Sequence, residues 1–310
     1  MGTTAIEVTG LVKSYGKLTA VDGIDLTVET GEIFAILGPN GAGKTTTVEI
    51  LEGFVRRNSG NVSVLGHDPA KNESSLKERI GIVGQETVAD PFLTVREMLT
   101  MIAGTYPRPK PVEDIIALVG LTDKHKTRSG KLSGGQKRRL DVAIALVGDP
   151  ELIFFDEPTT GFDPDARREA WEMIAGLRKL GKTIMLTTHY MEEAERLADR
   201  IAVIAGGKII SLGTPDTLGG RSGAKTRIRF RLPFGLLTLP EAITRFSVQS
   251  TDGLVQLAVD EPVKILHELT GWALAQNVTL QGLEVSRPSL EETYLALIAG
   301  AGLTTEKGRP

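Results

Sequence analysis

Residues 38–45, GPNGAGKT, have the residue types and spacing of a phosphate-binding loop, G-x-x-x-x-G-K-[ST]. EIFAILG at 32–38 precedes them as a buried strand would. We expect Lys44 to reach the β- and γ-phosphates, the Thr45 hydroxyl to bind Mg²⁺ and Thr46 to contact the α-phosphate. The alternative is a glycine-rich turn with an incidental lysine. The predicted nucleotide contacts in this loop are Gly38, Pro39, Asn40, Gly41, Ala42, Gly43, Lys44, Thr45 and Thr46.

Two carboxylates follow a second apolar run. ELIFFDEP at 151–158 is typical of a buried strand that ends at Asp156, with Glu157 directly after it. In phosphoryl transfer an aspartate here can hold Mg²⁺ through water, and the next carboxylate can orient or polarise the attacking water. Taken alone, Asp-Glu-Pro also suits the end of an ordinary strand. Together with the phosphate loop it predicts a triphosphate site, because such a site needs a carboxylate for its metal.

A second helix start with bare backbone N–H groups is expected within LSGGQ at 132–136. Helix N-termini of this kind attract phosphate and other anions. A glycine loop capped by Ser133 is the structural alternative. The sequence therefore predicts two phosphate-facing helix starts, where a single nucleotide needs one.

The elements that must position these side chains form one α/β unit, predicted over residues 1–218. Half-alternating runs near its start, AIEVTGLVKSY and IDLTVETGE, predict an antiparallel portion. TIMLTTH at 183–189 predicts a third buried strand, and RIAVIAGGKII at 200–210 predicts a hairpin-like pair. Residues 86–147 are expected to be mainly helical and to interrupt the strand series.

Capping residues mark where the helices begin. Thr94 and Glu97 form a capping box, and Asp163 followed by proline starts another helix. After a glycine-rich stretch, GGRSGAK, which we expect to be a flexible linker, the pattern changes to short alternating runs with a TDG hairpin turn. A last helix is capped by Ser289. We therefore predict a small α+β C-terminal domain over 225–310.

Composition narrows the class of protein. The 310 residues are 41% hydrophobic and 24% charged, as in ordinary globular proteins. The net charge of −3 does not favour a general nucleic-acid binder. The absence of cysteine excludes disulfides and thiolate chemistry. No apolar run approaches the roughly 18 residues that span a bilayer, so we expect that the chain does not cross a membrane unaided.

The phosphate loop, LSGGQ and the Asp-Glu pair, in this order, resemble the ATP-binding subunits of ABC transporters over about residues 5–218. The resemblance implies a P-loop NTPase core of the ABC ATPase type, with an antiparallel β subdomain and a helical subdomain. It implies that Tyr15 stacks on adenine, that Gln85 contacts Mg²⁺ and that His189 contacts the γ-phosphate. It also implies that Asp163 spans two subunits, although the residue alone predicts a helix cap.

The same resemblance explains the two phosphate-facing helix starts. In this family the signature residues cover the γ-phosphate that is bound at the phosphate loop of a second chain. Two chains then meet head to tail with two ATP molecules between them, and hydrolysis assisted by Glu157 and His189 reopens this homodimer. The signature residues in this sequence are Leu132, Ser133, Gly134, Gly135 and Gln136.

A separate integral membrane permease subunit is the other partner that the resemblance implies, which places this chain at the cytoplasmic face of the membrane. Docking is expected near Gln85 and along 86–100. Phe92 and Leu93 are possible contacts there, and they are equally well explained as part of the packing of the helical insertion.

Within the family, TTGFDP and the C-terminal extension resemble ABC-2 exporter ATPases of the daunorubicin/doxorubicin-resistance type. This implies export of a drug, antibiotic, lipid or other small molecule, whose identity no residue here specifies. The alternative is a soluble ABC-type ATPase that acts on DNA, ribosomes or another complex. Such proteins usually carry coiled coils, zinc modules or two cassettes, and this sequence has one phosphate loop and none of these. A regulatory chain with a dead site is disfavoured because Lys44 and the carboxylates are present.

Overall fold

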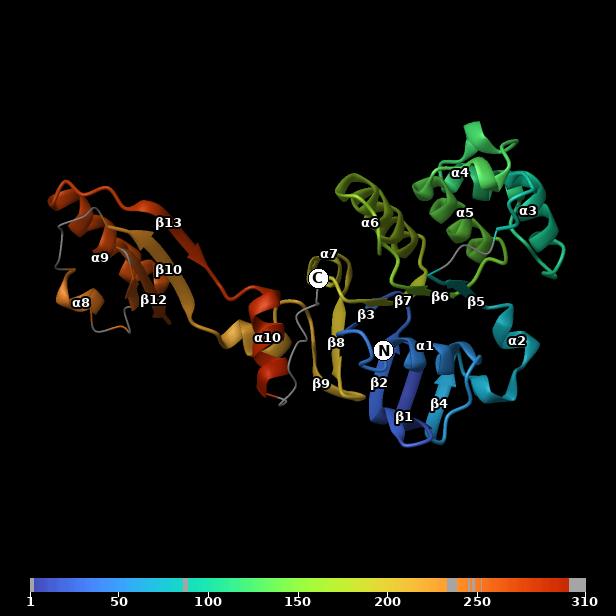
Figure 1. The fold of residues 1–310 in the computed structure, drawn as a ribbon, viewed down its shortest axis with the longest axis horizontal. Helices are drawn as coiled ribbons and strands as arrows, with labels where there is room; N and C mark the ends of the chain where they lie inside the picture. The colour runs from blue at the N-terminus through green and yellow to red at the C-terminus, as the bar shows by residue number, and fades with distance from the viewer. Residues whose placement is uncertain are drawn as a thin grey trace. The chain divides into compact units, whose positions relative to one another are not determined.

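The computed structural model describes residues 3–85, 89–232, 239–244, 246, 249–251 and 253–300 (Figure 1). The chain divides into two compact units. The first comprises Met1–Pro215 and the chain from Ile298 onwards, and the second comprises Asp216–Leu297.

The first unit is built around a six-stranded sheet in the order β5-β6-β7-β3-β8-β9. Its strands are parallel except for β9, which pairs antiparallel with β8. The strands are β3 (Ile33–Leu37), β5 (Ile80–Val83), β6 (Leu152–Asp156), β7 (Thr183–Thr188), β8 (Arg200–Ala205) and β9 (Lys208–Gly213). Every residue of β3 and β7 is buried, as expected for parallel strands covered on both faces. The three predicted buried strands and the predicted hairpin are confirmed.

The register of this sheet brings three strand ends together. Leu37 at the end of β3 pairs with Thr188 at the end of β7. Asp156 at the end of β6 pairs with Thr187 on the other side of β7. Because parallel strands end at one edge of a sheet, the segments that follow β3, β6 and β7 leave it side by side. The predicted phosphate loop, carboxylates and histidine lie on these three segments.

A second, three-stranded sheet confirms the predicted antiparallel portion. Its order is β2-β1-β4, with β1 (Thr4–Tyr15), β2 (Leu18–Glu29) and β4 (Ser59–Val64). Both neighbouring pairs are antiparallel. The buried faces of this sheet, of α1 (Lys44–Glu52) and of the six-stranded sheet share one hydrophobic core. Helix α1 therefore lies between the two sheets (Figure 1).

The opposite face of the six-stranded sheet is covered by α7 (Met191–Leu197), which also packs on α6 (Pro164–Lys179) (Figure 1). The apolar side of α6 includes Trp171, which is 3% exposed. Two short elements, η1 (Pro69–Lys71) and α2 (Ser74–Lys77), precede β5. The sheet is thus covered on both faces, and a site can form only at the ends of its strands.

The predicted helical insertion lies between β5 and β6. It contains α3 (Val95–Ala103), α4 (Val112–Leu118), α5 (Gly134–Leu146) and the 3₁₀ turns η2 (Thr122–Lys124) and η3 (Ser129–Lys131). The three α-helices pack on one another (Figure 1). The capping box at the start of α3 is confirmed: Glu97 N donates to Thr94 Oγ1 at 3.3 Å, and Thr94 N donates to Glu97 Oε2 at 2.8 Å.

The second unit is a split β-α-β-β-α-β arrangement with an antiparallel sheet in the order β11-β12-β10-β13. Its elements are β10 (Thr226–Arg231), α8 (Glu241–Thr244), β11 (Gln249–Thr251), β12 (Leu254–Val259), α9 (Pro262–Ala275) and β13 (Gln281–Ser286), followed by α10 (Leu290–Gly300). One sheet face packs on α8 and α9 around Phe230. The predicted hairpin joins β11 to β12, and Asp252 of its TDG turn lies outside the described residues.

The prediction of a flexible linker at GGRSGAK is wrong. Leu218–Gly223 forms 3₁₀ turns (η4) in which Gly219 and Gly220 have φ of 58° and 80°. Leu218 is fully buried, and Arg221 Nε donates to the carbonyl oxygen of Pro288 at 3.1 Å. The glycines are needed for left-handed backbone rather than for mobility.

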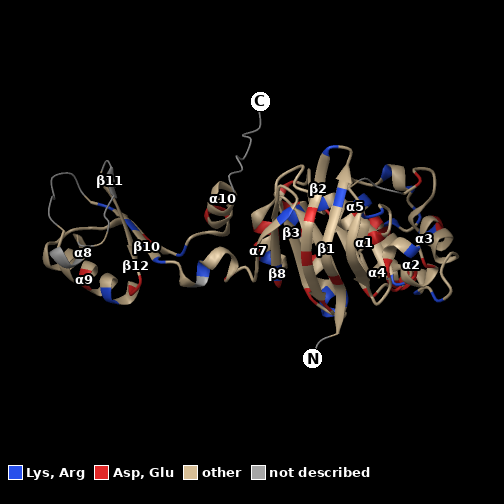
Figure 2. Cartoon of the chain, turned by 90° about the horizontal axis from the view of Figure 1, so that it is seen from below, with Lys and Arg blue, Asp and Glu red and all other residues tan. Residues whose placement is uncertain are grey.

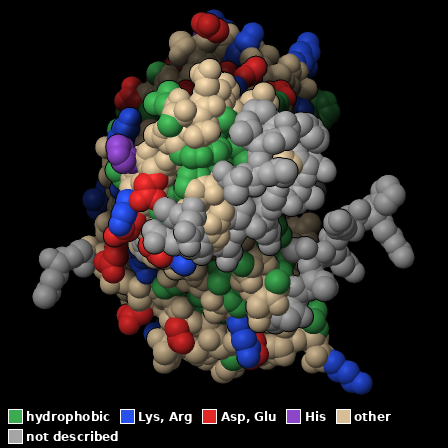
Figure 3. Space-filling model, turned by 90° about the vertical axis from the view of Figure 1, so that its left-hand side faces the viewer, with side chains coloured by type: hydrophobic (Ala, Val, Ile, Leu, Met, Phe, Trp, Pro, Cys, Tyr) green, Lys and Arg blue, Asp and Glu red, His purple; other side chains and the backbone are tan. Residues whose placement is uncertain are grey.

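Charged residues of both signs are interspersed along the described chain (Figure 2). On the second unit, Val263 and Leu274 of α9 are 80% and 82% exposed, and the face in Figure 3 carries apolar side chains among charged ones. Among the residues the structure describes, no helix is both long enough and apolar enough to span a membrane.

Candidate active site

The loop between β3 and α1 requires glycine for steric reasons. A Cβ on Gly38 would lie 2.3 Å from the carbonyl oxygen of Ile204, and a Cβ on Gly43 would lie 2.3 Å from that of Ala20. Gly41 and Gly43 also have φ of 78° and 103°, which L side chains rarely adopt. The strand, loop and helix follow one another as predicted, and Lys44 begins α1.

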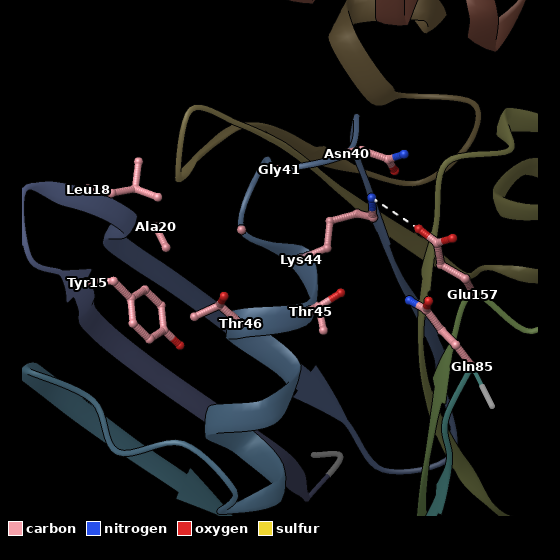
Figure 4. Close-up of a pocket in the computed structure, with 11 residues that line it drawn as sticks. Tyr15, Leu18, Ala20, Asn40, Gly41, Lys44, Thr45, Thr46, Gln85 and Glu157 are labelled. Atoms are coloured by element: carbon pink, nitrogen blue, oxygen red, sulfur yellow. Dashed lines mark ion pairs between the residues drawn. The ribbon is translucent and has the colours of Figure 1, made fainter. Parts of the chain in front are cut away.

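Lys44 is held at the centre of the loop with only 4% of its surface exposed. Its Nζ donates to the carbonyl oxygens of Gly38 at 2.9 Å and Pro39 at 3.2 Å. The same atom lies 3.4 Å from Glu157 Oε1, and the two side chains point toward each other (Figure 4). A buried ammonium needs such partners, and phosphate oxygens are chemically equivalent replacements for them.

A pocket of about 430 Å³ adjoins this loop (Figure 4). Its described lining residues are Tyr15, Leu18, Ala20, Asn40, Gly41, Gly43, Lys44, Thr45, Thr46, Gln85 and Glu157. The three-stranded sheet supplies one side, where the Tyr15 ring is 48% exposed. The strand ends supply the polar side. The pocket thus offers a surface for an aromatic base at one end and cationic and hydroxyl groups for phosphates at the other.

Asp156 lies at the end of β6 within a hydrogen-bonded group. Gln85 Nε2 donates to Asp156 Oδ2 at 2.9 Å, and the Thr187 hydroxyl donates to Asp156 Oδ1. Gln85 comes two residues after Val83, the last residue of β5. The structure therefore brings together two of the three residues that were predicted to serve the metal.

Glu157 has a strained backbone and a largely buried side chain. Its φ is 46°, and its N–H donates to both the carbonyl and the hydroxyl of Thr187, at 3.2 and 3.1 Å. Glu157 Oε2 lies 3.2 Å from His189 Nδ1 and accepts a hydrogen bond from the Thr160 hydroxyl at 3.1 Å. The structure thus places two predicted catalytic groups, Lys44 and His189, beside the carboxylate of the third, Glu157.

The electrostatic surroundings keep this carboxylate ionised. Burial alone would raise the pKa of Glu157, but the neighbouring His189 and Lys44 and the hydrogen bond from Thr160 bring the pKa below its ordinary value. At neutral pH Glu157 is therefore a carboxylate that is able to accept a proton.

The donor set beside the pocket fits Mg²⁺, which prefers oxygen ligands and is often held by one or two protein groups together with substrate phosphates. The Thr45 hydroxyl lines the pocket, and Asp156 and Gln85 are bonded to each other at its edge. No group of three or more His, Cys, Asp or Glu that could hold a metal occurs among the described residues. The residues thus fit an ion that arrives with a triphosphate.

The signature residues start α5 as a capped helix. Ser133 Oγ accepts from Gln136 N at 3.3 Å, and Gln136 Oε1 accepts from Ser133 N at 3.1 Å. Ser133 and Gly134 are exposed, Leu132 is buried, and a Cβ on Gly134 or Gly135 would meet nothing within 4 Å. None of the described residues that line the pocket comes from 132–136. These residues therefore do not complete the site of their own chain.

Asp163 caps α6. Its Oδ1 accepts from Asp165 N at 3.0 Å and from Ala166 N at 2.9 Å, and the residue is exposed. The helix cap that the sequence alone predicts is thus present. Phe92, in the stretch predicted to dock a partner, is 76% exposed, whereas Met98 is buried. Residues 86–88 of that stretch lie outside the described residues.

Four residues at the site were not predicted. They are Thr160 and Thr187, which donate hydrogen bonds to the carboxylates, Arg138, which donates to the carbonyl oxygen of Pro158, and Glu193, which accepts from the Thr159 hydroxyl. A signal for Thr187 exists, since it is a polar residue within an apolar strand. Arg138 and Glu193 lie in helices with many charged residues, and nothing in the sequence separates them from their exposed neighbours.

Comparison with protein families identifies both parts of the chain. The family profile described as ABC transporter matches residues 21–160. A second profile, described as ABC transporter domain-containing protein-like, C-terminal domain, matches residues 226–289.

Full-length relatives agree with these profiles. The chain is 35% identical over 304 residues to the linearmycin resistance ATP-binding protein LnrL of Bacillus subtilis strain 168, a match that covers 94% of this chain and 97% of that protein. It is 36% identical over 311 residues to the daunorubicin/doxorubicin resistance ATP-binding protein DrrA of Streptomyces peucetius, covering 95% of this chain and 92% of that protein. In fold it matches cbiO1 from Clostridium perfringens, part of the ABC transporter complex cbiONQ, with a TM-score of 0.63 and 28% identity over 69% of this chain and 89% of that one. With the phosphate loop, the paired carboxylates and the signature helix arranged as described, the chain belongs to the ATP-binding subunits of ABC transporters and is an ATPase of that family.

Proposed function

We propose that this chain hydrolyses ATP as one half of a head-to-tail homodimer that drives a separate membrane permease. In this proposal residues 1–218 form the nucleotide-binding domain and 225–310 an accessory domain. Adenine stacks on Tyr15 and the phosphates lie along 38–46, a placement supported by the lining of the pocket. Bound Mg²⁺ would be held by Thr45, Gln85 and Asp156 and would neutralise charge on the phosphate oxygens.

The proposed chemistry uses the charges around Glu157. An incoming γ-phosphate competes with Glu157 and the loop carbonyls for Lys44, which releases Glu157 Oε1. The ionised carboxylate then accepts a proton from the attacking water. His189, 3.2 Å from the other carboxylate oxygen, contacts the γ-phosphate and orients this group. Positioning and charge stabilisation suffice for phosphoryl transfer.

The observation that supports the proposed dimer is the exposed N-terminal end of α5, where the signature residues lie. Its N-terminal residues are exposed and do not line the pocket of their own chain, although a capped helix start of this kind suits an anion. We infer that Ser133 and Gly135 cover the γ-phosphate of a second copy, and that Asp163 lies near the same contact. ATP then closes the dimer because it binds the closed state more tightly than the open one.

The partner is proposed to be an integral membrane subunit at the cytoplasmic face, which this chain joins as a peripheral subunit. The exposed Phe92 beside the capped start of α3 supports docking in that region. Relatives named for resistance to linearmycin and to daunorubicin/doxorubicin support an ABC-2-type exporter of a drug, antibiotic, lipid or other small molecule. The interspersed charges of Figure 2 do not favour the alternative of a soluble ATPase that acts on nucleic acid.

A mixing experiment tests the shared site. Lys44→Ala disables the phosphate loop of one chain, and Ser133→Arg disables the signature of the other. Each variant alone should lack turnover. Mixed in equal amounts, they form heterodimers with one intact site, because the unaltered loop of one chain faces the unaltered signature of the other. The rate should recover to roughly a quarter of the wild-type rate if pairing is random.

The variants also provide the control. Ser133→Arg should bind a fluorescent ATP analogue with near wild-type affinity, because Ser133 does not line its own pocket. A mixture that stays as inactive as its components, although both variants are folded and dimeric, would contradict the proposal, since a site within one chain cannot be rescued in this way.

A further inference from the structure

The backbone at Glu157 is in a conformation that its surroundings must impose. Its φ of 46° is in the left-handed region, which costs free energy for any residue except glycine. A residue stays there only where neighbouring contacts fix the chain on both sides. On the N-terminal side Thr187 accepts the Glu157 N–H. The fixed points on the C-terminal side are the next two residues, Pro158 and Thr159.

Arg138 holds the first of these points. It lies on α5 and is 7% exposed. Its Nε donates to the carbonyl oxygen of Pro158 at 3.2 Å, and its Nη1 donates to the carbonyl oxygen of Gly84. Pro158 follows Glu157 and Gly84 precedes Gln85. One guanidinium therefore ties the backbones beside two site residues to a single helix.

Glu193 holds the second point from the opposite side. It lies on α7, a short distance after His189, and is fully buried. Its Oε1 accepts hydrogen bonds from the Thr159 hydroxyl at 2.7 Å and from Trp171 Nε1 at 2.9 Å. The carboxylate therefore links the segment after Glu157 to α6 and to the helix that follows the histidine.

The energetics indicate that these two buried polar side chains are kept for geometry. Burial lowers the pKa of Arg138, and the negative charges of Asp141, Glu193 and Asp156 offset part of this shift. Among the described residues, Arg138 Nη2 and Glu193 Oε2 have no hydrogen-bond partner. Burying charged groups whose bonds are incompletely satisfied is costly, and apolar residues would fill the same space with less penalty.

We propose that Arg138 and Glu193 form a clamp on Pro158 and Thr159 that positions Glu157 for hydrolysis. Arg138 extends this control to Gln85 through Gly84. Both are positioning residues, since neither lines the nucleotide pocket. The inference rests on the proposed function of Glu157.

The test compares Arg138→Gln and Glu193→Leu with matched controls one residue away. Leucine is used at position 193 because a glutamine oxygen would still accept both hydrogen bonds. Arg139→Gln removes a half-exposed arginine that pairs at the surface with Glu169 at 2.7 Å, and Glu192→Leu removes an exposed carboxylate of α7. For the two clamp variants we expect kcat to fall roughly 10- to 100-fold, as a displacement of about 1 Å produces. We expect KM and the affinity for a fluorescent ATP analogue to change by less than about twofold. The controls should keep the wild-type kcat.

A third variant covers the case in which loss of a buried charge prevents folding. Thr159→Val keeps the shape of the side chain and removes only the hydroxyl that bonds to Glu193. It should lower kcat without weakening ATP binding, and it should accumulate an ATP-bound dimer on size-exclusion chromatography, as Glu157→Gln is expected to do. In the Arg138→Gln/Glu193→Leu double variant the losses in kcat should not add, because both residues act on one segment.

The outcomes separate this inference from the proposed function. Wild-type kcat in folded Arg138→Gln, Glu193→Leu and Thr159→Val would overturn the clamp. So would a loss of ATP binding and of the dimer in Thr159→Val in proportion to kcat, since that is the result of general structural damage. If Glu157→Gln itself keeps wild-type turnover, the proposed role of Glu157 fails whatever the clamp variants do.

Discussion

Lys44 Nζ lies 3.4 Å from Glu157 Oε1, so the cation proposed to bind the γ-phosphate is paired with the carboxylate proposed to activate water. Lys44 begins the helix that follows β3, Glu157 directly follows β6, and both of these strands pair with β7. Because Lys44 also bonds to its own loop, one side chain contributes both to the proposed phosphate site and to the lowered pKa of Glu157. Replacing Lys44 should therefore change both the affinity for ATP and the pKa of Glu157.

Replacing Lys44 with alanine should weaken ATP binding about 10- to 100-fold, the equivalent of one or two charge-assisted hydrogen bonds. It should also raise the pKa of Glu157, because the Lys44 ammonium is one of the groups that lower this pKa. Titration with a fluorescent ATP analogue measures the first effect. Lys179→Ala, at the exposed end of α6, removes the same charge away from the site and should bind normally. Equal affinities for the two variants would mean that the loop does not hold the triphosphate.

Replacing Glu157 with glutamine should lower kcat by a factor of roughly 10² to 10⁴, the usual contribution of a general base. The side chain keeps its length, and the left-handed backbone is no more strained than before. ATP should still bind and should trap a closed dimer, which elutes earlier than the monomer on size-exclusion chromatography. Glu172→Gln, on the exposed side of α6, serves as the control and should not trap. A Glu157→Gln variant that stays monomeric with saturating ATP would count against the shared site.

Replacing Tyr15 with alanine should weaken binding of ATP but not of inorganic tripolyphosphate, which has no base. Stacking of a base on an aromatic ring contributes about 1–3 kcal/mol. Tyr15→Phe keeps the ring and should retain most of the affinity for ATP. Isothermal titration with both ligands tests this directly. Equal losses for the two ligands would show that Tyr15 affects the phosphate loop instead of the base, and unchanged affinity for both would place the base elsewhere.

The sequence predicts best those strands whose apolar residue pattern matches their burial in the folded chain. Strands β3, β6 and β7 are continuous apolar runs because both of their faces are covered, and each leads directly into a site residue. Strand β4 lacks such a pattern. It contains Gly60, where a Cβ would lie 2.4 Å from the carbonyl oxygen of Gly10, so close packing on β1 requires a residue that disfavours strands. The turns at 218–223 were mistaken for a linker for a related reason, since glycine can signal either mobility or left-handed backbone.

Only those site residues that belong to a sequence motif could be predicted. The motifs and the family resemblance named the nucleotide and metal contacts, but they did not predict that Lys44 bonds to its own loop or that Glu157 has a positive φ. The contacts of Arg138 and Glu193 join residues 20 and 34 positions away in the sequence, and they arise only from the way the helices pack. Their exposed neighbours are of the same residue types, so local sequence could not have distinguished them.

Glu52, at the end of α1, gives a prediction about stability. Burial, reinforced by the negative charges of Asp156 and Glu49, raises the pKa of this carboxyl from 4.5 to about 8. The folded chain therefore keeps Glu52 protonated at neutral pH, whereas the unfolded chain ionises it above about pH 4.5. The stability that the neutral form contributes is complete below pH 4.5 and is lost as pH rises through about 8.

Glu52→Gln mimics the protonated form at every pH and should remove this loss. We expect its Tm to fall less than that of the wild-type chain between pH 5 and pH 9, with the largest difference at the alkaline end. Differential scanning calorimetry across this range measures the effect, with Glu172→Gln as a control for the removal of one charge at an exposed position. Parallel curves of Tm against pH for Glu52→Gln and the wild-type chain would mean that Glu52 ionises normally. Burial and the negative charges of Asp156 and Glu49 would then not raise its pKa.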